Sequence, residues 1–253
     1  MDNTDLHEKQ KRRLIVALDV STADEALEAV SELRGEVGAF KVGLQLFTSE
    51  GASLVKRLAA SGIEIFLDVK YHDIPNTVAG AAAEAAKMGI WMFNVHASGG
   101  SEMMKAALGA ANDACERESL RLPKIVGVTV LTSSDRQALS ETGIEQTVEE
   151  RVLQLSELTA KCGLHGVVVS PFEARMIRDS LRVPGFEIVT PGIRPSNATH
   201  DDQKRVMTPA QAASAGSDYL VVGRPIMGAG DRVEAARQIV KEMTEAAGPT
   251  DPR

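Results

Sequence analysis

Short apolar segments recur along the chain at regular intervals, and longer segments with mixed polarity separate them. Each apolar segment is too short for a helix and too continuous for a half-exposed strand, which is typical of strands buried on both faces. Eight such strands are expected, at residues 14–18, 40–42, 63–67, 91–95, 125–130, 167–169, 188–190 and 219–222.

The segments between these strands have helical periodicity. The first helix is expected to begin after Ser21 or Thr22, and Glu25 stands three residues after Thr22 as in a capping box. Apolar residues return with helical spacing at 148–158 and again at 233–243. Eight strand–helix units in 253 residues give about 32 residues per unit, the usual size for a (β/α)₈ barrel. We therefore predict an α/β protein with a single (β/α)₈ TIM barrel.

An open, doubly wound parallel sheet is the alternative architecture, because it also alternates strands and helices. The first predicted strand lacks the Gly-x-Gly-x-x-Gly pattern that a dinucleotide-binding sheet would carry there. No linker divides the chain. We expect a frayed N-terminal extension at residues 1–12, the barrel domain at residues 13–247 and a C-terminal tail at residues 248–253.

Composition and charge exclude several classes of protein. The formal net charge is −7, which leaves no basic surface of the kind that binds nucleic acid. No apolar run approaches the roughly 18 residues that span a membrane, and residues 1–13 are too polar for a secretion signal. The two cysteines, Cys115 and Cys162, are far apart and lack metal-ligand spacing. A cytoplasmic protein that binds neither nucleic acid nor membrane is expected.

Charged residues gather where the predicted strands end. The first strand ends in Asp19, the second ends in or next to Lys41, and the third ends in Asp68, Val69 and Lys70, with Asp73 directly after. In a barrel the reactive groups lie at the carboxyl ends of the strands, so these side chains should converge at one rim. One interpretation is an ion-pair network that only orders the rim. The polar run at residues 68–77 is too costly to desolvate for a purely structural role, which favours a reactive site.

The ends of the last two strands carry arginines. Arg194 follows the seventh strand, and Gly223 and Arg224 follow the eighth. Barrels commonly bind phosphate with the loops after these two strands, and a guanidinium matches the geometry of phosphate oxygens. Each arginine taken alone could equally be an exposed charge beside a helix. Together at these positions they predict a phosphate site.

The run at residues 66–78, Phe-Leu-Asp-Val-Lys-Tyr-His-Asp-Ile-Pro-Asn-Thr-Val, resembles the signature of the orotidine 5′-phosphate decarboxylase family in its shorter bacterial form. The resemblance extends over residues 13–247. Further matching segments follow in the family's order, at residues 14–20, 41–43, 94–100, 130–133, 191–195 and 222–226.

The resemblance implies decarboxylation of orotidine 5′-phosphate to UMP and CO₂, the last step of de novo pyrimidine synthesis, with no metal and no organic cofactor. Lys70 would stabilise the C6 carbanion and protonate it, and Asp68 would lie near the departing carboxylate. Asp19 and Lys41 would bind ribose hydroxyls. Other substrate contacts implied by the family are Thr132 for the pyrimidine, although that residue could instead cap a turn, and Arg194, Gln203, Gly223 and Arg224 for the phosphate.

The family also implies a homodimer. Asp73, with Ile74 and Thr77, would enter the active site of the partner subunit. The nearest enzymatic rival is a magnesium-dependent sugar-phosphate decarboxylase or aldol-type synthase, which uses an acidic metal ligand where this chain has Lys41. A cation at that position would repel a divalent metal. A barrel that only binds a phosphorylated ligand is the non-enzymatic alternative.

Overall fold

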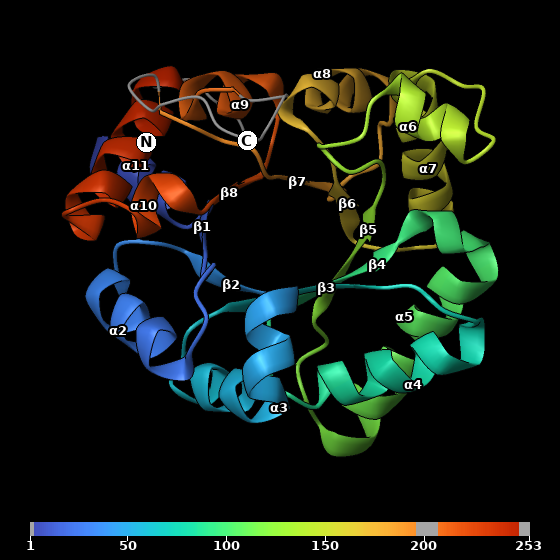
Figure 1. Cartoon of the computed structure of the whole chain (residues 1–253), viewed down its shortest axis with the longest axis horizontal. Coiled ribbons are helices and arrows are strands. Elements are labelled where there is room, and N and C mark those ends of the chain that lie inside the picture. The colour runs from blue at the N-terminus through green and yellow to red at the C-terminus, as the bar shows by residue number, and fades with distance from the viewer. Residues whose placement is uncertain (1–2, 196–206, 248–253) are drawn as a thin grey trace.

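The computed structural model describes residues 3–195 and 207–247. Eight parallel strands pair in chain order, and the first strand also pairs with the last, which closes the sheet into a barrel. The helices surround the strands (Figure 1). The predicted (β/α)₈ barrel is therefore confirmed, and the open sheet is excluded.

All eight predicted strands are present, with small differences at their ends. The third strand extends beyond its apolar run at residues 63–67 and includes Asp68, Val69 and Lys70, which are expected at its end, as well as Tyr71. The strands are β1 (Leu14–Ala17), β2 (Ala39–Gly43), β3 (Ile65–Tyr71), β4 (Met92–His96), β5 (Lys124–Val128), β6 (Gly166–Val168), β7 (Glu187–Thr190) and β8 (Tyr219–Val222).

The predicted capping box is confirmed, because the Thr22 side chain accepts from the Glu25 N–H and the Glu25 side chain binds the Thr22 N–H. The helices are α1 (Asn3–Lys11), α2 (Ala23–Leu33), α3 (Leu44–Ala60), α4 (Pro75–Ala86), η1 (Ala97–Gly99), α5 (Gly100–Glu118), α6 (Arg136–Glu141), α7 (Val148–Lys161), α8 (Pro171–Ser180), α9 (Pro209–Ala215), α10 (Arg224–Met227) and α11 (Arg232–Ala247).

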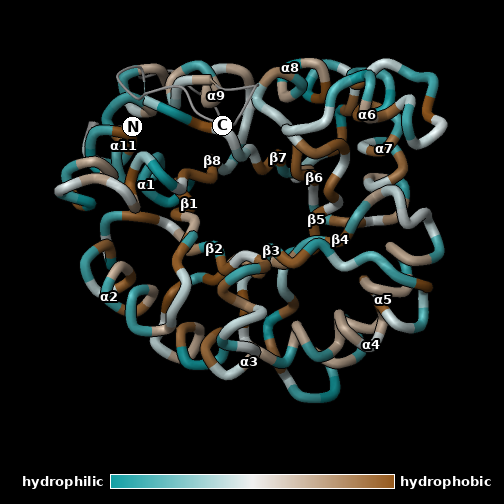
Figure 2. Tube along the Cα trace, viewed as in Figure 1, coloured by the Kyte–Doolittle hydropathy of each residue, from teal (hydrophilic) through white to brown (hydrophobic). Residues whose placement is uncertain are grey.

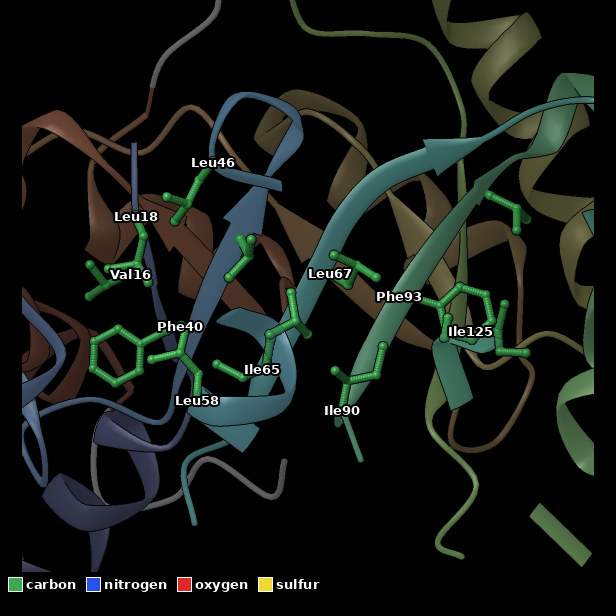
Figure 3. Close-up of a cluster of buried hydrophobic side chains, with 14 of the residues drawn as sticks. Val16, Leu18, Phe40, Leu46, Leu58, Ile65, Leu67, Ile90, Phe93 and Ile125 are labelled. Carbon is green, nitrogen blue, oxygen red and sulfur yellow. The ribbon is translucent and has the colours of Figure 1, made fainter. Parts of the chain in front are cut away.

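Apolar side chains form two layers, because successive residues of a strand point to opposite faces. The larger layer lies between the strands and the helices, and Figure 3 shows Val16 of β1 and Phe40 of β2 there with Leu58 of α3. The smaller layer includes Ile15, Phe66 and other strand residues on the opposite face, inside the barrel. Figure 2 shows the resulting pattern, with hydrophobic strands around the axis and hydrophilic positions on the outer helices.

The N-terminal segment differs from the prediction. Asn3–Lys11 forms helix α1, which packs against α11, with Leu6 6% exposed and Gln10 fully buried. The expectation that residues 1–12 are frayed is wrong for this helix, because a single apolar residue and the stems of long polar side chains suffice to cover α11. The predicted tail at residues 248–253 lies outside the described residues. No helix in the described part of the chain is long and apolar enough to cross a membrane.

Candidate active site

The inner face of the barrel changes from apolar to charged toward the carboxyl ends of the strands. On β3, Phe66 points inward and Asp68 is the next inward residue. The same alternation leads from Ala39 to Lys41 on β2. These side chains line a cavity of about 320 Å³, which is large enough for a small ligand. Other predicted site residues also line the cavity, namely Asp19, Lys70, Thr132, Arg194, Gly223 and Arg224.

Four charged groups form a continuous chain along one wall of the cavity. Lys41 Nζ lies 3.5 Å from Asp19 Oδ1 and 3.3 Å from Asp68 Oδ2. The second lysine contacts the other oxygen of the same carboxylate, with 2.6 Å between Lys70 Nζ and Asp68 Oδ1. Positive and negative charges therefore alternate, and Asp68 is the carboxylate that both lysines share.

The environment of Asp68 keeps it ionised. Burial alone would raise the pKa of this carboxyl, but the charges of Lys41 and Lys70 and hydrogen bonds from Lys70 and Asn94 hold the pKa below its ordinary value. The Asp68 carboxylate is thus held ionised between the two lysines. A cluster of this kind can fix charges in place before a substrate binds.

Asn94 is a site residue to which the sequence analysis gave no role. It lies on β4 and is fully buried, and its side-chain amide contacts both Asp68 and the backbone N–H of Lys70. A signal for it was available, because Met92 points into the barrel and Asn94 is the next inward position on that strand. A buried amide at that position has to be hydrogen-bonded to polar neighbours.

The two arginines line the same cavity at the ends of β7 and β8. Gly192 has φ +81°, a conformation that suits glycine, in the turn that leads from β7 to Arg194. Arg194 is 8% exposed, and its N–H donates to the Met207 carbonyl at 3.0 Å. Gly223 follows β8, and a Cβ atom there would approach Asp19 Oδ2 to 2.7 Å. Both arginines line one cavity, and the phosphate site that they are expected to form stays a prediction.

Comparison with known proteins identifies the family. Residues 12–239 match the model of the Orotidine 5′-phosphate decarboxylase / HUMPS family. The chain belongs to this family.

Two relatives and one solved structure show how similar the chain is to individual proteins of the orotidine 5′-phosphate decarboxylase / HUMPS family. The chain is similar to an orotidine 5′-phosphate decarboxylase of Syntrophotalea carbinolica, with 51% identity over 238 residues that cover 93% of this chain and 96% of the relative. The corresponding protein of Chromobacterium violaceum is 50% identical over 235 residues, 93% of each chain. The crystal structure of the decarboxylase from Lactobacillus acidophilus superposes with a TM-score of 0.80 at 38% identity, covering 91% of this chain and 98% of the other.

Some residues that the family resemblance assigns to the substrate site lie outside the cavity of their own chain. Asp73, Ile74 and Thr77 precede or begin α4 and are exposed, Ile74 to 66%. The Asp73 carboxylate accepts the Ile74 N–H at 2.6 Å. Gln203, the expected third phosphate contact, lies outside the described residues. The fourth charge beside Lys41, Asp68 and Lys70 in this subunit is therefore Asp19.

Proposed function

We propose that this protein decarboxylates orotidine 5′-phosphate to UMP and CO₂, the last step of de novo pyrimidine nucleotide synthesis. The observation that carries the proposal is a single cavity lined by two kinds of charged group. Lys70 lies next to the carboxylate of Asp68, and Arg194 and Arg224 line the same cavity. The first suits a developing carbanion and the second a phosphate dianion.

Each bond change in the reaction has a group to support it. The bond between C6 and the carboxylate breaks, CO₂ leaves, and the electron pair stays on C6 of the pyrimidine. Lys70 stabilises this charge and donates a proton from Nζ to C6, which forms UMP. Asp68 faces the leaving carboxylate, so the binding energy of the distant phosphate offsets their repulsion in the bound state.

The remaining cavity residues bind the parts of the nucleotide that do not react. Asp19 and Lys41 are proposed to bind the ribose hydroxyls, and Thr132 the pyrimidine. Arg194, Arg224 and the backbone at Gly223 are proposed to hold the phosphate. All of these residues line the same cavity, which supports the assignment.

We propose that the reaction needs no metal ion and no organic cofactor. Lys41 lies between the carboxylates of Asp19 and Asp68, where a divalent cation would otherwise bind. The net charge of −7 disfavours nucleic acid as a ligand. A free nucleotide of the cytoplasm is therefore the proposed substrate.

An assay with orotidine 5′-phosphate tests the function. The purified protein should convert it to UMP, measured by the change in ultraviolet absorbance, and excess EDTA should leave the rate unchanged. Activity that requires magnesium and a sugar phosphate without the pyrimidine would instead favour the metal-dependent relatives of this barrel.

We further propose a homodimer in which Asp73, Ile74 and Thr77 enter the partner's cavity. Their exposure supports this assembly, because an isolated subunit leaves Ile74 in solvent. Co-expression of Lys70→Ala and Asp73→Asn chains tests it. Each variant alone should be nearly inactive, whereas the mixture should regain about a quarter of wild-type activity, because half of the dimers are mixed and carry one intact site. No recovery in the mixture would contradict shared sites.

A further inference from the structure

Strands β3 and β4 pair irregularly where the charged groups begin. Leu67 is paired with Phe93 and Tyr71 with Val95, so residues 68–70 lie opposite Asn94 alone. Extra residues in one strand disrupt the ladder and leave backbone groups that need other partners. These extra residues include Asp68 and Lys70.

The side chain of Asn94 supplies the missing partners. Its Oδ1 accepts the Lys70 backbone N–H at 2.8 Å, and its Nδ2 donates to Asp68 Oδ1 at 2.7 Å. The chemistry of the two neighbours fixes the orientation of the amide, because a backbone N–H only donates and a carboxylate only accepts. The same Asp68 oxygen also receives Lys70 Nζ at 2.6 Å. One amide therefore connects the two residues to which we assign the chemistry.

Lys70 has a backbone conformation that needs such support. Its φ of +52° lies in the left-handed region, where a residue with a side chain is strained. Conformations of this kind persist only where neighbouring groups hold them. Asn94 is fully buried on the inner face of β4, so its side chain has little freedom to follow a movement of Lys70.

We propose that Asn94 is a positioning residue for the decarboxylation, an inference that rests on the proposed function. Its acceptor holds the Lys70 backbone so that the ammonium points into the cavity. Its donor holds Asp68 in the orientation that lets one carboxylate bind both lysines. It does not itself touch the reacting atoms.

Removal of the amide tests the proposal. Asn94→Leu keeps most of the side-chain volume and removes both hydrogen bonds. Its kcat should fall about 100-fold, because a small displacement of a reacting group has an effect of that order. KM should change little, because the phosphate end of the cavity is intact. A folded Asn94→Leu variant with the kcat of wild type would overturn the proposal.

Asn94→Asp gives a readout that a purely structural role would not produce. The protonated acid can accept from the Lys70 N–H and donate to Asp68, as the amide does, whereas the ionised form repels Asp68. The kcat of this variant should therefore fall as the pH rises, while kcat of Asn94→Leu stays low throughout. A pH profile for Asn94→Asp parallel to that of wild type would contradict the inference.

The groups that titrate around this position are present in every variant. They are Asp68 and Lys70 on β3, Lys41 on β2, and His96 at the end of β4 with His72 beside it, while β5 presents Val126 opposite Asn94. Wild type therefore serves as the reference for their contribution to each profile.

A matched control separates positioning from stability. Ser156 is also fully buried, and its hydroxyl donates to the Val152 carbonyl at 2.7 Å within α7. Ser156→Ala should lower the melting temperature but leave kcat and KM unchanged. A kcat loss in Ser156→Ala as large as that in Asn94→Leu would mean that general destabilisation explains both, and would overturn the proposal.

A measurement without substrate keeps the inference separate from the proposed function. The ¹³C carboxyl resonance of Asp68 reports its pKa, which should be higher in Asn94→Leu than in wild type because a donor to the ionised form is lost. An unchanged pKa would overturn the inference even if the protein decarboxylates orotidine 5′-phosphate. An inactive wild-type protein with the expected shift would refute only the function.

Discussion

The two ends of the barrel both hold charged side chains inside the fold, yet they are built for different outcomes. At the carboxyl ends of the strands lies the network of Asp19, Lys41, Asp68 and Lys70, here called the carboxyl-end network. At the amino ends lies a second group, here called the amino-end cluster, which consists of Trp91, Lys124, Glu187 and Tyr219.

The polar groups of the amino-end cluster contact one another and do not face the cavity, so we call this cluster closed. Lys124 Nζ donates to Glu187 Oε1 and, at 3.1 Å, to Tyr219 Oη, while Tyr219 Oη donates to Glu187 Oε1 at 3.2 Å. The ammonium also lies 5.6 Å from the centre of the Trp91 ring, within the range of a cation–π contact. Lys124 thus contacts a carboxylate, a hydroxyl and an aromatic ring, and none of the four residues lines the cavity.

The carboxyl-end network is open on one side. Lys70 Nζ contacts Asp68, and Lys70 also lines the cavity, so an ammonium with three donors has further N–H bonds to offer a ligand that binds there. The comparison shows that the same residue types serve stability or reactivity according to what faces them. A closed cluster holds the sheet together, whereas an open network keeps charge available for a substrate.

The largest expected effect is in the open network. Lys70→Ala should lower kcat at least about 10⁴-fold, because it removes both the proton donor and the charge beside C6. The melting temperature should change little, since Asp68 keeps its contacts with Lys41 and Asn94. Steady-state kinetics and thermal unfolding on the same sample measure both quantities. Wild-type turnover in this variant would refute the assigned role of Lys70.

In the closed cluster a substitution should lower stability and leave activity unchanged. Lys124→Met leaves Glu187 without its cation, and we expect the free energy of unfolding to fall by about 2 kcal/mol, with kcat and KM unchanged. This is below the roughly 3–5 kcal/mol for fully buried pairs, because the side chains are 27% and 19% exposed.

Urea unfolding measures the loss in Lys124→Met, and the m-value shows whether the transition stays two-state. The double variant with Glu187→Leu serves as control and should recover much of the stability, because an apolar pair replaces the lone carboxylate. A fall in kcat in Lys124→Met would contradict the separation of the two ends.

The sequence predicts the carboxyl-end network better than it predicts the amino-end cluster. The strands are visible because burial on both faces makes them apolar, and Asp68 and Lys70 stand out because they directly follow such a run. Lys124, Glu187 and Tyr219 are far apart in the sequence, and each resembles an ordinary polar residue at the start of a strand. The lateral pairing of β5 to β8 in the sheet brings them together, so no local pattern predicts their contact.

The third strand shows a different limit of prediction from sequence. Its apolar run covers only residues 63–67, and the strand is expected to end in Asp68, Val69 and Lys70, whereas β3 continues to Tyr71. The strand continues because those charges face the cavity and the partner Asn94, which are features of the closed barrel. The left-handed conformation of Lys70 likewise depends on that tertiary contact and has no glycine to signal it.

The smallest expected effects, on stability at extreme pH, also distinguish the two ends. The pKa of Asp68 is lowered in the folded protein, because the charges of Lys41 and Lys70 outweigh burial. Its contribution is fully present above the unfolded pKa of about 3.9 and is lost as the pH falls through the folded value. The difference in unfolding free energy between wild type and Asp68→Asn should therefore be constant from pH 5 to 7 and shrink in acid.

The amino-end cluster should lose its contribution in alkali instead. Burial alone would lower the pKa of Lys124, but its hydrogen bonds to Glu187 and Tyr219 raise it. A raised pKa of a base gives stability that is full below the unfolded value, about 10.4, and is lost as the pH rises through the folded one. The difference between wild type and Lys124→Met should accordingly persist in mild acid and shrink above about pH 10. Urea unfolding across the pH range measures both differences. If the two variants converge with wild type at the same end of the range, the two clusters do not differ in the way their contacts indicate.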